Sequence, residues 1–427
     1  MNKNVDSYYD KYLKYKSKYL LLKKQIGGKL LVPTNIIKNL FPYLNNKTAS
    51  ELSKVNRQFV CEYGKEFLFK KYSVIQYYPN KNQIKKIYFD LDNQIDEGML
   101  PESLKEITFG FRFTNGDKRL KVGVLPKTLE KLTFGYYFTN GDTELKVDVL
   151  PESLKELTFD TNFTNGGMSL KANVLPKSLK KLTFGDSFNN GDQPLRANIL
   201  PQKLQELTFG INFTNGRQKL EVDVLPKLLK SLTFGTNFTN GGKPLAADVL
   251  PQTLEELKFG DWFNNGSEPI KAGVLPQSLK ELKFGHWFKN GNKPLTVGVL
   301  PKSLKTLTFD NDFTNGNQQL KVGVLPQTLK EITFGDKFDI TLEVGVLPES
   351  LETLTFGKEF NNGGKPLEVC VLPQTLKELT FGEFFTNGHK PLAVGVLPKS
   401  LKKLTISTKF TNGGQSFPPN IEVVYTT

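Results

Sequence analysis

The sequence predicts a mainly β solenoid that carries a small all-α module at its N-terminal end. Residues 100–124 recur almost unchanged as far as residue 416, and thirteen Leu-Pro pairs mark the recurrences. Eleven of the twelve intervals between these pairs are 25 residues long, and the other is 22. Each unit contains one short alternating apolar pattern, whereas residues 5–72 carry apolar residues at helical spacing. A strict period of this length indicates a stack of one small structural unit.

Residues 5–26 predict an amphipathic helix, because their apolar and aromatic residues fall at alternating spacings of three and four. Gly27-Gly28 then ends the pattern, so that residues 1–28 form one segment. One interpretation is a coiled coil that makes a homodimer through residues 5–26. The other is a helix lying on a neighbouring surface, which the tyrosines on its apolar face favour.

Residues 30–72 predict a module of three short helices. Their apolar positions are Ile36, Ile37, Leu40, Phe41 and Leu44, then Leu52, Val55 and Phe59, then Phe67, Leu68 and Phe69. A module of about 40 residues buries too little apolar surface to be stable alone. We therefore expect it to pack against another surface.

This module resembles the F-box. The matching residues are Leu31, Pro33, Ile36, Ile37, Leu40, Phe41, Pro42, Tyr43, Leu44, Leu52, Val55, Asn56 and Arg57, with Phe59 and residues 67–69 where that family usually has tryptophan. The resemblance implies binding to a Skp-type adaptor within a cullin-RING ubiquitin ligase. The adaptor-facing residues that it implies are Pro33, Ile36, Ile37, Leu40, Phe41 and Leu44. The alternative is a helical cap that closes the N-terminal end of the solenoid.

The two ends of the array depart from its consensus. Residues 73–99 read as a degenerate capping repeat in which residues 84–89 match residues 104–109. Residues 417–427 supply one last capping strand. Terminal coils are expected to be atypical, because they face solvent or another module.

Within each unit, residues 104–109 predict a short strand whose Ile107 and Phe109 point inward. The outward Thr108 recurs in eleven of thirteen units, with Lys258 and Lys283 as the exceptions. A ladder of β-branched residues suits stacked strands.

The rest of the unit predicts a second internal column, a loop and a return segment. Phe113 and its equivalents form the column, and Asn115-Gly116 is a strong tight-turn signal. We expect a row of small loops, interrupted at Asp339 in the 22-residue unit. Residues 120–124 alternate again and predict a second strand or an extended segment on the convex side. Leu-Pro closes the coil, because proline lacks an N–H that needs a partner there.

The units resemble the FNIP repeat, a relative of the leucine-rich repeat. The resemblance rests on the pattern LPxSLxxLxFGxxF and on Pro-Leu pairs such as Pro194-Leu195 and Pro366-Leu367. It covers residues 100–416 in thirteen units and implies a leucine-rich-repeat-like solenoid. With the F-box resemblance, the whole is similar to the F-box and FNIP repeat proteins of giant amoeba viruses of the mimivirus type.

That combined resemblance implies a function. It implies the substrate-receptor subunit of a Skp/cullin/F-box-type ubiquitin ligase, which binds an unknown target protein through the solenoid. The alternative is a protein-binding scaffold or sequestering protein with no link to ubiquitin.

The distribution of charge argues against a nucleic-acid partner. Of the formal net charge of +14, residues 1–99 hold most, with 18 Lys/Arg against 9 Asp/Glu. The repeats are nearly balanced and predict no one-sided basic stripe.

The apolar runs near the N-terminus are too short for a membrane span or a signal peptide. We therefore expect no membrane contact and a location inside the cell. The resemblance to giant-virus proteins implies that this location is the host cytoplasm. Cys61 and Cys370 offer no disulfide framework, which fits a reducing compartment.

No motif for catalysis, a metal or a cofactor is evident, since the two histidines, His286 and His389, are about 100 residues apart. We expect a non-catalytic protein that needs no cofactor. Binding surfaces are instead expected where the repeat breaks its own pattern. Trp262 and Trp287, the only tryptophans, hold the same position in adjacent units.

Tryptophan is favoured at the energetic centres of interfaces, so these breaks predict partner-binding residues. The predicted residues are Trp262, Trp287, His286, Lys258, Lys283, Tyr136, Tyr137 and Phe111. The alternative is that the two indoles simply cover the phenylalanine column.

Overall fold

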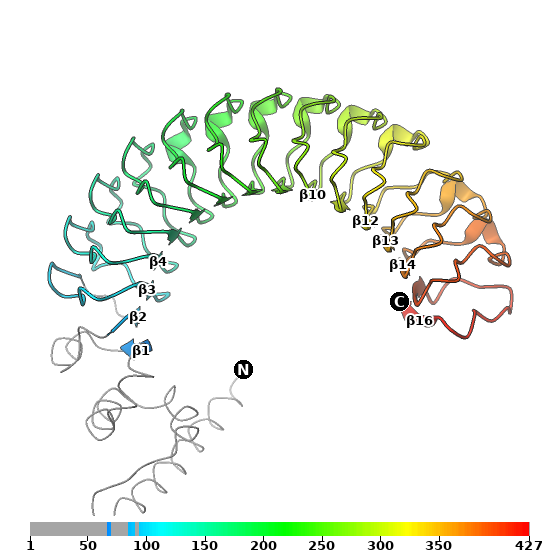
Figure 1. Ribbon diagram of the computed structural model, residues 1–427, viewed down its shortest axis with the longest axis horizontal. Coiled ribbons are helices and arrows are strands. Elements are labelled where there is room, and N and C mark those ends of the chain that lie inside the picture. Colours follow the sequence, from blue (N-terminus) through cyan, green and yellow to red (C-terminus); the bar gives the residue numbers. More distant parts are fainter. Residues whose placement is uncertain (1–65, 70–83, 90–93, 427) are drawn as a thin grey trace, which may run out of the picture.

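The computed structural model describes residues 66–69, 84–89 and 94–426 of the chain. Sixteen short strands form one sheet in sequence order, and every neighbouring pair is parallel. The coils follow an arc with the strands on its concave side and the loops on its convex side (Figure 1). The predicted solenoid of stacked repeats is confirmed.

The strands are β1 (Glu66–Phe69), β2 (Lys86–Phe89), β3 (Glu106–Phe109), β4 (Lys131–Thr133), β5 (Glu156–Thr158), β6 (Lys181–Thr183), β7 (Glu206–Thr208), β8 (Ser231–Thr233), β9 (Glu256–Lys258), β10 (Glu281–Lys283), β11 (Thr306–Thr308), β12 (Glu331–Thr333), β13 (Thr353–Thr355), β14 (Glu378–Thr380), β15 (Lys403–Ser407) and β16 (Glu422–Thr426). Equivalent residues of successive units pair directly, as in Ile107 with Leu132 and Thr108 with Thr133. The inward residues are buried and the threonine ladder is half-exposed, as the alternation predicts.

Two columns of phenylalanine fill the interior. Phe109 and Phe113 stack within one coil with ring centroids 3.9 Å apart, and Phe113 stacks on Phe138 of the next coil at 6.0 Å. One hydrophobic cluster runs from Ile84 to Ile421 without a break. Burying one phenylalanine contributes about 1.5–3 kcal/mol of transfer free energy. Because each coil leaves its flat faces apolar, only stacking supplies that burial.

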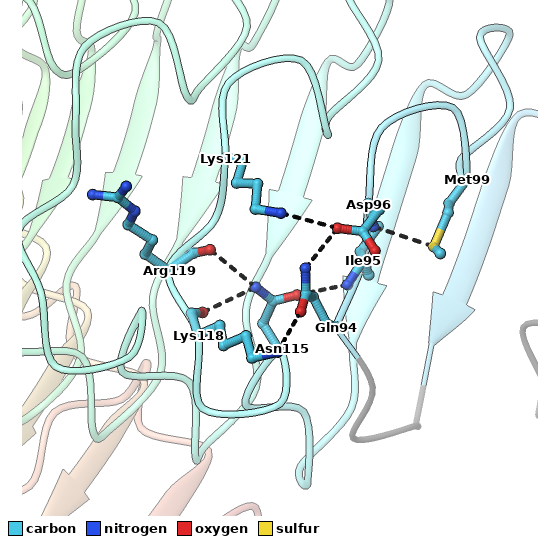
Figure 2. Close-up of polar contacts among 8 residues, drawn as sticks. All are labelled: Gln94, Ile95, Asp96, Met99, Asn115, Lys118, Arg119 and Lys121. Carbon is cyan, nitrogen blue, oxygen red and sulfur yellow. Dashed lines mark hydrogen bonds and ion pairs between the residues drawn. The ribbon is translucent and has the colours of Figure 1, made fainter.

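A column of buried asparagines joins the convex side of each coil to the coil before it. Asn115 accepts a hydrogen bond from the Ile95 backbone N–H at 2.8 Å and donates to the carbonyls of Lys118 and Arg119 (Figure 2). The residues that repeat the contact to the preceding coil are Asn140, Asn165, Asn190, Asn215, Asn240, Asn265, Asn290, Asn315, Asn362, Asn387 and Asn412. Buried backbone groups are thereby satisfied where no strand can do so.

The Asn-Gly pairs are left-handed turns, as predicted, with φ of 64° at Asn115 and 61° at Gly116. In eight coils the turn tightens into a single 3-10 element. These elements are η3 (Asn190–Asp192), η4 (Asn215–Arg217), η5 (Asn240–Gly242), η6 (Asn265–Ser267), η7 (Asn290–Asn292), η8 (Asn315–Asn317), η9 (Asn362–Gly364) and η10 (Asn387–His389). None lies between η8 and η9, so the predicted interruption at Asp339 is confirmed.

Of the two alternatives predicted for residues 120–124, the second strand is absent, and residues 122–123 form a turn. The prediction for residues 66–69 is wrong. Residues 66–69, predicted to belong to a third helix, form β1 instead. They pair with β2 through Phe67 with Ile87 and Phe69 with Phe89, which makes them a further copy of the repeat strand. The rest of the predicted F-box-like module lies outside the described residues.

Candidate protein-binding surface

The coils present one row of irregular side chains, which we call the rim. It consists of the two residues that precede the second phenylalanine column in each unit, such as His286 and Trp287. They follow the carboxyl ends of the strands and lie in a turn. Backbone hydrogen bonds join neighbouring turns, for example from Trp287 N to Asp261 O at 2.8 Å. The backbone of the rim is therefore held in a regular row, and its side chains can vary in sequence without disturbing the core.

Trp262 and Trp287 stack on each other at the rim. Their ring centroids are 5.4 Å apart with 20° between the planes. The two side chains remain 51% and 42% exposed. About half of each indole therefore faces solvent.

A buried carboxylate orders the basic residues beside this stack. Asp312 occupies the next rim position and is only 2% exposed. Lys337 Nζ lies 2.6 Å from its Oδ1 and Lys289 Nζ lies 3.3 Å from its Oδ2. Lys289 Nζ is also 5.7 Å from the Trp287 ring centroid, within cation–π range. Asp312 thus holds one lysine where it can cover the indole.

The charge state of this cluster follows from its contacts. Burial raises the pKa of Asp312, but hydrogen bonds from Lys337 and Lys289 more than offset that effect and leave the pKa below its ordinary value. The same hydrogen bond raises the pKa of Lys337. Asp312 and Lys337 are therefore both ionised at neutral pH. Neither Asp312 nor Lys289 is among the sequence-predicted site residues. The available signal was an aspartate at the rim position directly after the two tryptophans.

His286 also lies beside the stack. Its ring centroid is 5.3 Å from that of Trp287, and its Nδ1 is 3.0 Å from Asn311 Nδ2. His286, Trp262 and Trp287 form one patch, as the sequence grouping predicts.

Lys258 and Lys283 lie elsewhere. They end strands β9 and β10 and pair with each other in the outward ladder of the concave sheet. Lys258 Nζ makes an ion pair with Glu281 at 2.7 Å. Sequence reasoning placed these lysines beside the indoles because they share the same two units, but it is Lys289 that contacts an indole.

A second aromatic cluster occupies the N-terminal part of the rim. Phe111 stacks on Tyr136 at 4.8 Å and meets Tyr137 edge-on at 5.0 Å. Phe111 and Tyr137 are 55% and 44% exposed. A third position, Phe384, is exposed beneath Lys409. The rim thus carries exposed aromatic side chains at three separate places along the arc.

The predicted adaptor-binding residues, from Pro33 to Leu44, lie outside the described residues. Within the described ranges no three His, Cys, Asp or Glu side chains gather closely enough to hold a metal ion. In the same part of the chain, no helix has the length and apolar character needed to cross a membrane.

This architecture defines a repeat solenoid of the leucine-rich-repeat type. Matches to the FNIP repeat model cover residues 168–212, 215–262, 242–286, 263–312, 291–337, 317–359, 338–384 and 360–409. The chain belongs to the FNIP repeat family. A comparison with curated proteins returned no match.

Among solved structures, the chain is similar to CroV588, described as a novel circular LRR protein. The two are 33% identical with a TM-score of 0.66, over 81% of this chain and 50% of CroV588. The chain therefore spans about half the length of that relative. YopM from Yersinia enterocolitica WA-314 is 18% identical over 86% of this chain and 83% of its own, with a TM-score of 0.43. A leucine-rich repeat protein from Bacteroides ovatus ATCC 8483 is 13% identical over 81% and 85%, with a TM-score of 0.19.

Proposed function

We propose that the chain is the substrate-receptor subunit of a Skp/cullin/F-box-type ubiquitin ligase, and that the rim of its solenoid binds the target protein. The observation that carries the binding role is the exposed Trp262–Trp287 stack on a rigid scaffold. Large aromatic side chains held in fixed geometry bind with little loss of conformational entropy. The ubiquitin link rests on the F-box resemblance, and a location in the host cytoplasm and a giant-virus origin go with it.

In this proposal residues 1–28 form a leading helix and residues 30–65 the adaptor-binding module, since residues 66–69 already belong to the sheet. Residues 73–99 and 417–427 cap the array at 100–416. Target and adaptor would thus bind at separate parts of one chain. The solenoid itself would do no chemistry.

The adaptor half of the proposal is tested by pull-down with a purified Skp-type adaptor. The intact chain should capture the adaptor, and Leu40→Asp should abolish capture while circular dichroism shows an unchanged array. The matched control is Asn46→Asp, at the predicted break after the first helix. Failure of the intact chain to capture any Skp-type adaptor would remove the ubiquitin link.

The target half is tested by crosslinking to cell lysate followed by identification of what attaches near Trp262. Trp262→Ala with Trp287→Ala should weaken binding of that protein by about thirtyfold, the loss expected when a hot spot worth about 2 kcal/mol is removed. The control is Asn212→Ala with Asn237→Ala, a hydrogen-bonded pair in the same column, two coils and one coil before Trp262. Equal loss in both double variants would place binding elsewhere.

The second candidate is a scaffold or sequestering protein without any ubiquitin link. The observation that favours it is that the candidate binding surface consists of solenoid residues alone and needs no part of the N-terminal module. It predicts target capture at the rim together with an inert module in the adaptor pull-down. A homodimer through residues 5–26 is a separate proposal, and an unchanged sedimentation mass after deletion of residues 1–28 would dismiss it.

A further inference from the structure

The backbone register brings a single column of residues to the edge of the sheet opposite the rim, just before each strand. The N–H of each member donates to the carbonyl of the member one coil earlier, at 2.7–2.8 Å, beginning with Lys105 N to Lys85 O. We call this column the lysine edge. Its members are Lys85, Lys105, Glu130, Lys155, Lys180, Gln205, Lys230, Glu255, Lys280, Lys305, Lys330, Glu352, Lys377 and Lys402.

Ten of these fourteen residues are lysine and three are glutamate, so the column carries a net charge of +7. The near-balance of charge across the repeats does not reveal this column. The compensating carboxylates lie in other columns. Seven of the strands β3 to β15 begin with glutamate, one position further along on the concave face.

The lysines of this column are accessible and only partly neutralised. Each glutamate sits between two lysines, as Glu255 does between Lys230 at 3.7 Å and Lys280 at 2.5 Å. The side chains of these two lysines are 59% and 52% exposed. Lys180, Lys305 and Lys402 have no carboxylate within ion-pair distance in the described part of the chain. Successive coils are about 4.8 Å apart at the strands, so neighbouring lysines act together within one Debye length of about 8 Å.

We propose that the lysine edge binds an acidic segment of a polypeptide, one that presents its carboxylates along a single line. Charge complementarity favours a polyanion, and three features favour polypeptide over nucleic acid. The column contains no arginine, the usual residue for bidentate phosphate contacts. It has no aromatic side chain on which bases could stack. Its embedded glutamates and the glutamates beside it would repel the unbroken charge of a phosphate backbone.

The test uses the full chain and labelled poly-L-glutamate of about 20 residues, followed by fluorescence anisotropy between about 50 and 200 mM salt. The intact chain should bind, and the affinity should fall at least about tenfold over that salt range. Lys280→Gln, Lys305→Gln and Lys330→Gln together should lower the affinity at low salt about tenfold. These three are the longest uninterrupted run of lysines in the column.

The matched control neutralises three exposed loop lysines, Lys243→Gln, Lys293→Gln and Lys365→Gln, and should change the affinity less than about twofold. Residues 1–99 are also basic and attract anions in both variants. The decisive quantity is therefore the difference in affinity between the two triple variants. Equal losses in both, or none in either, overturn the proposal. Tighter binding of a uridine homopolymer, weakened selectively by the lysine-edge variant, would assign the edge to nucleic acid instead. None of these outcomes depends on the rim or on the adaptor module.

Discussion

At the scale of single residues, the repeated shape of each coil depends on the buried asparagine of its Asn-Gly turn. Asn215 is fully buried, and its Oδ1 accepts a hydrogen bond from Leu195 N at 2.8 Å while its Nδ2 donates to two carbonyls of its own turn. Sequence reasoning recognised the Asn-Gly pair as a turn but not the asparagine as a link between coils. Its backbone is left-handed, a conformation that asparagine tolerates better than most residues.

Asn215→Ala should destabilise the array by about 1–3 kcal/mol, because it leaves the buried Leu195 N–H without an acceptor. Urea unfolding followed by circular dichroism measures the change. Gln218→Ala in the same turn is the control, since its side chain is exposed. Equal stability of the two variants would show that water replaces the asparagine.

Gly216 is constrained differently. It has φ of 60°, and a Cβ atom there would lie 2.8 Å from the Asp192 carbonyl oxygen in the preceding coil. Gly216→Ala should therefore cost roughly 2 kcal/mol or more, combining left-handed strain with backbone displacement. The measurement is again urea unfolding, and Gly242→Ala is an informative comparison. Gly242 shares a positive φ but a Cβ there would meet open space, so it should cost less.

At the scale of elements, the columns along the sheet determine how stability responds to pH. Hydrogen bonds from Lys105 and Lys155 lower the pKa of Glu130 to about 2, and those from Lys330 and Lys377 lower the pKa of Glu352 to about 2. A carboxyl whose pKa is depressed on folding stabilises the protein above its unfolded pKa. That contribution disappears as the pH falls from about 4.5 toward 2.

Thermal unfolding should therefore shift to lower temperature between pH 5 and pH 2. The variant Glu130→Gln, Glu255→Gln and Glu352→Gln should be modestly less stable than the parent at pH 6, and its acid-induced drop should be smaller. Differential scanning calorimetry at several pH values gives both quantities. A variant that keeps the full drop would show that other carboxyls, such as Asp312, dominate acid sensitivity.

At the scale of the whole molecule, each coil contacts only its neighbours, so stability is approximately a sum of coil and interface contributions. Phe213 lies near the middle of the array and is fully buried between Phe188 and Phe238. The two centroid distances are 6.4 and 6.3 Å, so its removal opens both interfaces.

Phe213→Ala should cost about 3–5 kcal/mol. Hydrogen exchange should show that protection is lost first in β6 to β8, while β3 and β14 remain protected. A uniform loss along the array would instead mean that the solenoid unfolds as one cooperative unit. Phe410→Ala, at the end of the column, has one neighbouring ring and should cost less.

The period of the sequence by itself determined the solenoid, the inward columns and the interruption at Asp339. These follow from local alternation and from exact repetition, which fix what each residue's equivalent in the next coil must be. The helix predicted at residues 67–69 was wrong, because three consecutive apolar residues suit a helix or a strand equally well. Only pairing with β2 decided between the two.

The tertiary structure alone decided which side chains meet across coils. It placed Lys289 rather than Lys283 against Trp287, buried Asp312 between two lysines, and gathered ten lysines on one edge of a nearly neutral array. The net charge of the array does not say where on the surface its charged side chains lie. The register of the stacked strands does, because it gives every residue a neighbour one coil away. The surface chemistry of such a molecule therefore depends on columns of equivalent residues. These residues become spatial neighbours only when the coils are stacked.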